Sequence, residues 1–532
     1  MLLLLLCALQ GAPAAGPDFA ARHVPLHHDI TVSVGDTGTH VLGVVATTWR
    51  LGSAQPVEVP LDSAFRVVRV LTDGEGDTRM GRITFAVNPG GGVYIPHHKR
   101  AGDTLHTTIR YHGAVTDGLI IQTDSSGRRM VFGDNWPDRE RHWLPIPLGP
   151  EDKATVDLHL EVPGDLAVIG NGVLTRIDTL ARGRRTWHFH LGQRIPPYGI
   201  VFGAGPLTLA PLAPAGCAVK CVPLAVMSFP EDSAWAVQGP FRRAGDMLDF
   251  FSQLVGPFPY DRLTHVQSST RFGGMENPTA IFYDTRAYAT RRLNEGTVAH
   301  ETAHQWFGDA VTEAEWHHLW LSEGFASYYA ALWIGHADGD SAFRASMQRQ
   351  ALSVFDSPAS GRPILDFAAT DLMGMLNTNN YEKGAWVLHS LRGLIGDSAY
   401  QQGIRSWFTT YRDSSALSSD FAAIMGRAAG QDLGWYFHQA LEQAGFPELE
   451  VRWGRRGSRL ELTIRQVQSA AWGSYRIPNL AVAIDGRRVS VNLAGPETRL
   501  IVPGVLRDPA RLVVDPDGWW LLRTRSVEKS GS

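Results

Sequence analysis

The chain has 532 residues, of which 44% are apolar and 19% are charged, and this length and composition favour several soluble, globular domains over a small module or a disordered segment. Its 49 basic and 53 acidic side chains give a net charge of -4. This balance provides no overall attraction to nucleic acid or to an anionic membrane, so neither is expected as a partner.

An apolar run at residues 2–9 precedes small residues at positions 12–15. This pattern is typical of a secretory signal peptide and predicts one over residues 1–15, with export of the protein to the periplasm or the medium. The run is too short to cross a bilayer as a helix, so no stable membrane insertion is expected. Without this segment two cysteines remain, Cys217 and Cys221, which either close a small disulfide loop or stay reduced as buried thiols.

The segment after the predicted signal peptide has the residue pattern of β-strands. Apolar and polar residues alternate, or nearly so, in segments 28–34, 104–110 and 155–162, and turn-forming residues separate these segments. The pattern predicts an N-terminal antiparallel β domain over residues 16–210.

The period of the pattern then changes from two residues to three or four. Apolar residues recur at helical spacing in five segments, namely 244–251, 295–307, 322–334, 382–394 and 420–429. They predict a mostly helical domain over residues 211–445. Short alternating strands return after residue 446 and predict a third, all-β domain over residues 446–525, which makes the fold class multidomain α+β.

The second of the predicted helices contains the pattern His300-Glu301-x-x-His304. Two histidines four positions apart project from one helix face, so their imidazole nitrogens can reach the same Zn²⁺ while Glu301 points at the open position of the metal. Glu323 follows His304 by nineteen positions, at the start of the next predicted helix. We therefore expect His300, His304 and Glu323 to form a catalytic site for one Zn²⁺ per chain.

Two further histidines, His317 and His318, lie between these motifs. They belong to the connecting segment rather than to the face of His300, so they are expected to be exposed or packing residues. Ser327, one turn after Glu323, is a candidate for a hydrogen bond to a metal ligand.

Three motifs in this order resemble the signature of the zinc aminopeptidases of peptidase family M1: Gly-Gly-Met-Glu-Asn at 273–277, the zinc motif with Glu323, and Asn-Tyr-Glu-Lys-Gly at 380–384. The likeness covers roughly residues 24–520 and is to the short bacterial members that lack a C-terminal helical domain. It implies a saddle-like β domain, a thermolysin-like catalytic domain and a β-sandwich.

The chemistry of a zinc site suggests a role for Glu301. Water bound to zinc titrates near about pH 7 in favourable sites, so a neighbouring carboxylate can take its proton as the water attacks a peptide carbonyl. Glu301 fits this role of general base. The resemblance implies that the hydroxyl of Tyr381 stabilises the oxyanion that forms.

The resemblance also implies how the substrate is recognised. Glu276 would bind the free α-ammonium group of a peptide through a charge-assisted contact that an internal peptide bond cannot make. Gly273 and Gly274 carry no side chains and leave room for a substrate strand to pair alongside. Met275 is expected to line the pocket for the N-terminal residue.

These assignments predict a zinc-dependent aminopeptidase that hydrolyses N-terminal residues from peptides with a free N-terminus. One alternative is a zinc endopeptidase that uses the same site. A less favoured alternative is an inactive relative that serves as a binding scaffold, although every motif residue is present.

Overall fold

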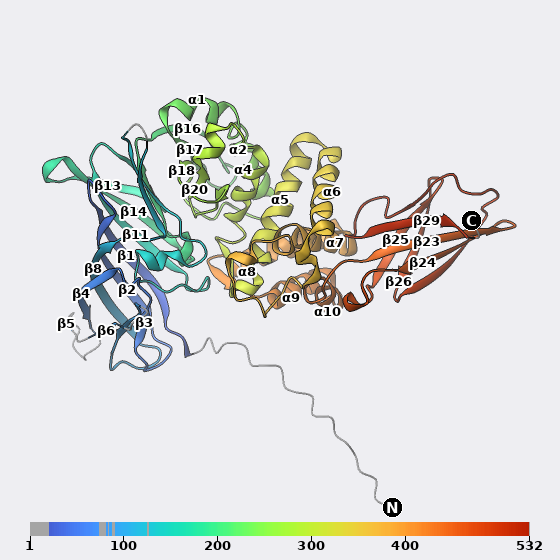
Figure 1. Ribbon diagram of the computed structural model, residues 1–532, viewed down its shortest axis with the longest axis horizontal. Coiled ribbons are helices and arrows are strands. Elements are labelled where there is room, and N and C mark those ends of the chain that lie inside the picture. The colour runs from blue at the N-terminus through green and yellow to red at the C-terminus, as the bar shows by residue number, and fades with distance from the viewer. Residues whose placement is uncertain (1–20, 74–80, 83–84, 88–90, 125–126, 531–532) are drawn as a thin grey trace, which may run out of the picture.

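The computed structural model describes residues 21–73, 81–82, 85–87, 91–124 and 127–530. The predicted signal peptide lies outside the described residues. The described chain is a multidomain mixed α/β structure, with β-sheets at both ends of the long axis and the helices between them (Figure 1). Within the described ranges, no helix combines the length and the apolar character that crossing a bilayer requires.

The N-terminal part is built mainly on an eight-stranded sheet. Its strands, in spatial order, are β13 (Val173–Thr179), β14 (Arg184–Ile195), β11 (Ala154–Pro163), β1 (Val24–Val34), β2 (His40–Arg50), β8 (Thr104–Ala114), β4 (Phe65–Thr72) and β5 (Gly81–Arg82). Most neighbours are antiparallel, as predicted, but β1 and β11 pair in parallel. Alternation of apolar residues has the same period in both kinds of pair, so the pattern predicts the strands and not their direction.

Two smaller sheets complete this part. One contains β12 (Ala167–Gly170), β15 (Phe202–Gly205), β10 (Arg129–Gly133) and β9 (Leu119–Thr123), and the other contains β3 (Val57–Val59), β7 (Val93–Ile95) and β6 (Ala86–Val87). Buried apolar residues of β1, β11 and these sheets share one core.

A five-stranded sheet opens the central part, where mostly helices were predicted. Its order is β16 (Thr208–Ala215), β17 (Val222–Ser228), β18 (Leu263–Ser268), β20 (Ala280–Asp284) and β19 (Gly274–Met275), and β17, β18 and β20 run parallel. Every residue of β18 and β20 is buried, so these strands have no polar face that would produce an alternating pattern. The predicted domain limit at residue 210 falls inside β16, and Cys217 and Cys221 form a disulfide between β16 and β17.

The helices follow this sheet and confirm the five predicted helical segments. They are α1 (Pro230–Gln238), α2 (Ala244–Leu254), α3 (Thr285–Ala289), α4 (Glu295–His304), α5 (Trp320–Asp338), α6 (Asp340–Asp356), α7 (Gly384–Ile395), α8 (Asp397–Tyr411), α9 (Ser418–Ala429) and α10 (Gly434–Phe437). Two short strands, β21 (Val311–Glu313) and β22 (Ser414–Ala416), pair beside them. The segment Asn379–Lys383, predicted in part as the start of a helix, is a π-helical turn ahead of α7.

The C-terminal part consists of two sheets around one apolar core. One sheet is β27 (Glu497–Pro503), β24 (Arg459–Gln466), β23 (Glu448–Arg456) and β29 (Arg523–Lys529), and the other is β26 (Arg487–Leu493), β25 (Ile477–Ile484) and β28 (Leu512–Val514). Alternate residues of these strands, such as Leu460, Leu462 and Ile464 of β24, fill the core between them.

A buried lysine joins the N-terminal sheets to the central part. The Lys153 ammonium donates hydrogen bonds to the carbonyl oxygens of Asp309 and Ala310, each at 2.8 Å, and to that of Ser414 at 3.1 Å. Burial lowers the pKa of Lys153 to about 7. Because Asp309 and Ala310 directly precede β21 and Ser414 begins β22, one side chain ties three distant parts of the chain together.

Two buried histidines make the stability of the fold depend on pH. Burial lowers the pKa of His28 and that of His265 from 6.5 to about 3. Below pH 6.5 the unfolded chain takes up protons that the folded chain does not, so each histidine should reduce the free energy of unfolding by about 1.4 kcal/mol between pH 7.5 and 5.5. In thermal unfolding followed across this range, the midpoint of His28→Gln should fall less than that of the wild type. Substitution of the exposed His98 by glutamine should leave the wild-type slope, and equal slopes for all three proteins would contradict the prediction.

Candidate active site

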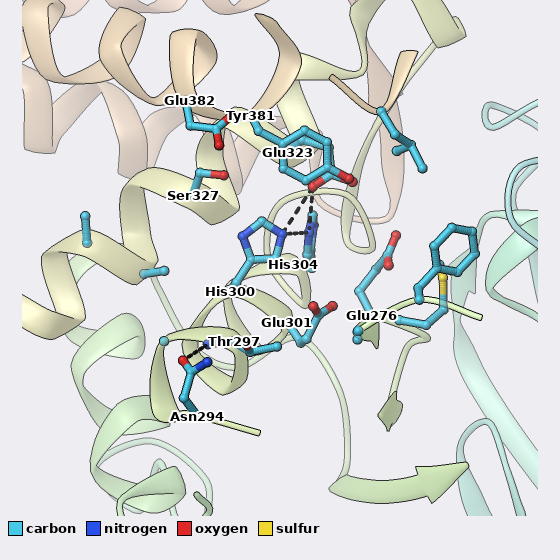
Figure 2. A pocket seen from close by; sticks show the side chains of 18 of the residues that line it. Glu276, Asn294, Thr297, His300, Glu301, His304, Glu323, Ser327, Tyr381 and Glu382 are labelled. Carbon is cyan, nitrogen blue, oxygen red and sulfur yellow. Dashed lines mark hydrogen bonds and ion pairs between the residues drawn. The ribbon is translucent and has the colours of Figure 1, made fainter. Parts of the chain in front are cut away.

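Two consecutive helices position the predicted metal ligands. Helix α4 begins after Asn294, whose side-chain oxygen accepts a hydrogen bond from the Thr297 N–H at 3.1 Å, a typical N-cap. His300 and His304 project from α4 one turn apart. Glu323 lies in the first turn of α5, which packs against α4, so the loop between the helices brings the three side chains together (Figure 2).

The three candidate ligand atoms form a compact triangle. His300 Nε2 lies 3.1 Å from His304 Nε2 and 3.2 Å from Glu323 Oε2, and the latter two atoms are 3.3 Å apart. A tetrahedral zinc ion with bonds of about 2.0–2.2 Å separates its ligand atoms by about 3.3–3.6 Å. The spacing and the chemistry of this donor set therefore fit a catalytic zinc site.

The second ring nitrogen of His304 is held by the protein. His304 Nδ1 lies 3.0 Å from the carbonyl oxygen of Phe307 and 3.1 Å from the hydroxyl of Ser322. A proton on Nδ1 that is donated to the carbonyl leaves Nε2 free to bind a metal. Gly308, with φ +114°, makes this packing possible, because a Cβ there would lie 2.3 Å from the Ser322 hydroxyl. The serine that forms a hydrogen bond with a candidate ligand is Ser322. For Ser327, the serine proposed from the sequence, no such bond is found within the described residues.

Glu301 lies beside the ligands and against the loop that carries Glu276 (Figure 2). A carboxylate oxygen of Glu276, one of Glu301 and a ring nitrogen of His304 lie within 4.8 Å of one another. Strand β19 passes so close that a Cβ on Gly274 would lie 2.2 Å from the Glu301 carboxylate. Glycine at this position therefore allows the loop and the carboxylate to approach each other.

Gln305 fixes the loop that carries Glu276, and sequence reasoning missed it. Its amide nitrogen donates to the backbone oxygen of Glu276 at 2.6 Å and to the Asp309 carboxylate at 2.7 Å, while its oxygen accepts from the Thr279 N–H at 3.0 Å. The one sequence signal was its place directly after His304.

Tyr381 faces the ligands from the π-helical turn before α7. Its ring lies parallel to that of His300, with an interplanar angle of 6° and centroids 5.9 Å apart. Helices α5 and α7 cross at Gly324 and Gly384, where a Cβ on either residue would lie 2.8–2.9 Å from the backbone of the other. This close crossing brings Tyr381 to the side of Glu323.

The carboxyl groups in the site differ in the direction in which their surroundings shift the pKa. It raises the pKa of Glu276 to about 7 and that of Glu301 well above its usual range. Burial acts in the same direction on Glu323, but the neighbouring His304 and His300 outweigh it and lower the pKa of Glu323. Glu323 is thus held as the anion that a metal ligand must be, whereas Glu301 sits where a proton is readily accepted.

The predicted site residues line one cavity, which has a volume of about 520 Å³. All nine of them line it: Gly273, Gly274, Met275, Glu276, His300, Glu301, His304, Glu323 and Tyr381. Ser327 also lines it. Trp136, Phe272 and Leu376 complete one wall and were not predicted, because they come from parts of the chain that no local pattern connects.

The two histidines between the motifs stay outside this cavity, as predicted. His318 is buried, and its Nδ1 lies 2.7 Å from the Ser418 hydroxyl. His317 Nε2 lies 3.0 Å from the carbonyl oxygen of Ala369. The aromatic residues beside the motifs do not belong to the site, because they are buried in the core of the central part: Trp306, Phe307, Tyr328, Tyr329 and Trp333.

Sequence comparison identifies a family model and relatives that match part of the chain. Residues 241–439 match the family model of the peptidase family M1 domain. Leucine aminopeptidase 2 of Aspergillus fumigatus is 28% identical over 319 residues, which are 57% of this chain and 49% of that protein. Glutamyl aminopeptidase of Rattus norvegicus is 24% identical over 373 residues, which are 66% of this chain and 39% of that protein. The chain thus spans about half the length, or less, of these curated relatives.

The fold has solved counterparts. An M1 zinc metallopeptidase from Deinococcus radiodurans is 24% identical with a TM-score of 0.70, covering 80% of this chain and 94% of that one. A mutant of the Deinococcus protein bound to a Tyr-Ser-Ala substrate has a TM-score of 0.69, with 79% of this chain and 94% of that chain covered. At this identity the comparison establishes the fold.

Proposed function

We propose that this chain is a zinc-dependent aminopeptidase that removes N-terminal residues from peptides, since residues 241–439 match the peptidase family M1 domain. The observation that carries the proposal is the arrangement around one cavity of a His₂Glu donor triangle, a buried Glu301 and a second buried carboxylate, Glu276. The first two groups suit hydrolysis of a peptide bond, and the third suits recognition of a free amine.

His300, His304 and Glu323 would hold one Zn²⁺. When bound, the ion polarises the substrate carbonyl and lowers the pKa of a water that it holds. Glu301 would take a proton from the attacking water, and the raised pKa of its carboxyl group suits this transfer. The same carboxyl group would then deliver the proton to the departing amine. Tyr381, whose pKa burial and the Glu323 carboxylate raise well above its usual range, stays protonated and would donate a hydrogen bond to the oxyanion.

Glu276 would recognise the substrate's α-ammonium group. Its carboxylate lies on the His304 side of the site, and its backbone is fixed by Gln305. Buried, with no lysine or arginine lining the same cavity among the described residues, the carboxylate is available to a cationic ligand. An N-terminal ammonium would supply the opposite charge, and an internal peptide bond would not.

Assays on matched peptides test this proposal. A peptide with a free N-terminus should be cleaved at its first bond, whereas the N-acetylated peptide of the same sequence should be cleaved at least about a hundredfold more slowly, because loss of one buried charge pair costs about 3 kcal/mol or more. Glu276→Gln should raise KM for the free peptide and reduce this preference. Equal turnover of both peptides by the wild type would contradict the aminopeptidase proposal and favour an endopeptidase, and turnover of neither by zinc-loaded protein would favour a binding scaffold.

The architecture and location of the enzyme belong to the same proposal. We infer a saddle-like N-terminal β domain to about residue 210, a thermolysin-like catalytic domain to residue 445 and a C-terminal β-sandwich to about residue 525. We also infer export, which the Cys217–Cys221 disulfide supports because such bonds persist in oxidising compartments.

A further inference from the structure

The two ends of the cavity differ in polarity. The axis of helix α4 runs from one end of the cavity to the other. Glu276 lies near His304, at the C-terminal end of α4, whereas Thr297 lines the cavity near the N-terminal end of the helix. An α-helix rises 1.5 Å per residue, so seven residues separate these two positions by about 10 Å along the axis. A peptide with its amine at Glu276 and its first carbonyl at the metal ligands would therefore direct its following residues toward Thr297.

The side chain of the first residue must stay at the Glu276 end. Its Cβ is two bonds from the amine nitrogen, a separation of about 2.5 Å, and the carbonyl group that leads to the metal ligands occupies the other branch. The nearest part of the cavity wall therefore determines which side chain is accepted.

That part of the wall is apolar and aromatic. Trp136, Phe272, Met275 and Leu376 line the cavity and belong to one hydrophobic cluster. Trp136 and Met275 are buried, whereas Phe272 and Leu376 are only partly covered and still present apolar surface. The opposite end is more polar, since its lining includes Asn294, Thr297, Ser327, Ser346 and Gln350.

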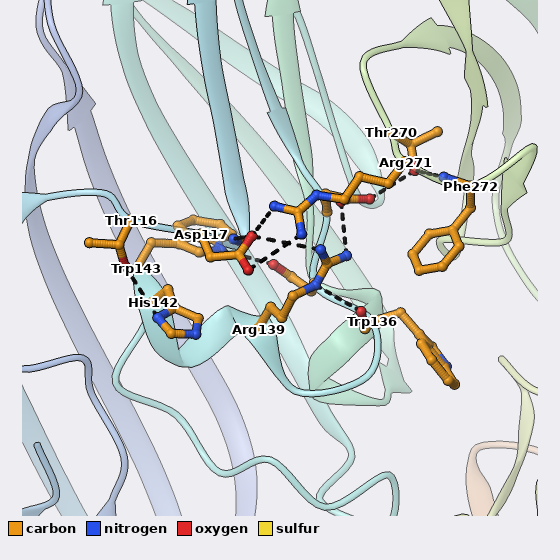
Figure 3. A network of polar contacts seen from close by, with 12 residues as sticks. Thr116, Asp117, Trp136, Arg139, His142, Trp143, Thr270, Arg271 and Phe272 are labelled. Carbon is orange, nitrogen blue, oxygen red and sulfur yellow. Dashed lines mark hydrogen bonds and ion pairs between the residues drawn. The ribbon is translucent and has the colours of Figure 1, made fainter. Parts of the chain in front are cut away.

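A network of charges holds the aromatic wall in place (Figure 3). The buried Asp134 accepts hydrogen bonds from the Thr270 hydroxyl and from the guanidinium of Arg139, each at 2.8 Å. Arg139 also donates to the backbone oxygen of Trp136 at 2.9 Å and lies over the ring of Phe272, 5.7 Å from its centroid.

The rings of Trp136 and Phe272 meet edge to face with centroids 6.0 Å apart, at the end of the network (Figure 3). The network joins the N-terminal sheets, which supply Trp136, to the loop that leads from Phe272 to Glu276. Contacts within the protein therefore hold the wall residues, which lowers the entropic cost of binding an aromatic side chain.

We propose that the Glu276 end of the cavity is a specificity pocket for aromatic side chains, so that the preferred substrates are peptides whose first residue is phenylalanine, tyrosine or tryptophan. This inference rests on the proposed function, because it uses Glu276 as the anchor of the amine. Edge-to-face contacts with Trp136 and Phe272 favour an aromatic ring beyond the area that it buries. A charged side chain would lose its solvation there, because none of the four wall residues carries a charge.

Two substrates that differ only in the first side chain test the pocket. The wild-type enzyme should hydrolyse phenylalanyl arylamide with a kcat/KM at least about tenfold above that of alanyl arylamide, which is the effect expected from even a small gain in apolar contact. Phe272→Ala should reduce this ratio toward one, because it removes one face of the pocket from the phenyl ring. Leu376→Ala should reduce the ratio in the same direction. The thermal midpoint of each variant shows whether a loss reflects the pocket or the fold.

Binding measurements separate this proposal from the proposed function. Calorimetry on zinc-loaded protein should show tighter binding of free L-phenylalanine than of L-alanine, and Phe272→Ala should remove the difference. Hydrolysis without an aromatic preference would overturn the pocket and leave the aminopeptidase intact. Selective binding without hydrolysis of either arylamide would retain the pocket and overturn the activity, and equal binding of the two amino acids would overturn the pocket.

Discussion

Glu301→Gln should lower kcat by about a hundredfold to ten-thousandfold, which is about 2.7–5.5 kcal/mol of transition-state stabilisation, while the protein keeps its zinc. Glutamine has nearly the same shape as glutamate but cannot take a proton from the attacking water. The three proposed metal ligands are unchanged in this variant, so metal binding should persist. Steady-state kinetics together with metal analysis of the purified variant check both parts of the expectation.

A matched substitution on the same helix provides the control. Glu295 begins α4 and pairs with Arg243 outside the cavity, so Glu295→Gln should retain kcat within about twofold. If Glu301→Gln lost its zinc, or if its kcat stayed near that of Glu295→Gln, the assignment of Glu301 as the base would be wrong.

His304→Ala should lose zinc and, with it, nearly all activity. Removal of His304 leaves two of the three protein ligands and also breaks the contacts of its ring with Phe307 and Ser322. A metal that stabilises the transition state by several kcal/mol contributes at least about a thousandfold to the rate, so a comparable loss is expected. Zinc content after dialysis and turnover with added zinc measure the two effects separately.

The neighbouring His317 supplies the control for metal binding. It lies close to the ligands in the sequence, but it contacts Ala369 and does not line the cavity. His317→Ala should therefore keep a full equivalent of zinc. Retention of both zinc and rate by His304→Ala, or loss of zinc from His317→Ala, would show that the ligand set is different.

Residue spacing alone could predict the zinc motif and its third ligand, whereas Glu276 and Tyr381 were placed by the resemblance of their motifs to a known family. The spacing of His300 and His304 determines their geometry as soon as the segment is a helix, and the apolar period predicts that helix. Glu323 could be placed beside the two histidines because the nineteen positions after His304 are enough for a loop to fold the next helix back against the first. These inferences use local periodicity, which the alternation in β1 and β24 also provides.

The parts that sequence could not predict depend on contacts between distant segments. The central sheet was missed because β18 and β20 are buried on both faces and show no alternation. Trp136 reaches the cavity from the N-terminal sheets, more than a hundred residues before the zinc motif. Gln305 acts through a backbone oxygen, and no residue pattern marks a carbonyl group as a hydrogen-bond acceptor.

The contact between Gly324 and Gly384 has a consequence for how freely the sequence of this protein can be altered. The gap between the helix that carries Glu323 and the segment that carries Tyr381 is set by two backbones, with no side chain between them to be exchanged for a longer or shorter one. Side-chain substitutions in the surrounding core should therefore leave the distance between these two segments unchanged. The wall of the proposed pocket is made of the side chains of Phe272 and Leu376, so its shape can be changed by side-chain replacement at a distance from this backbone contact.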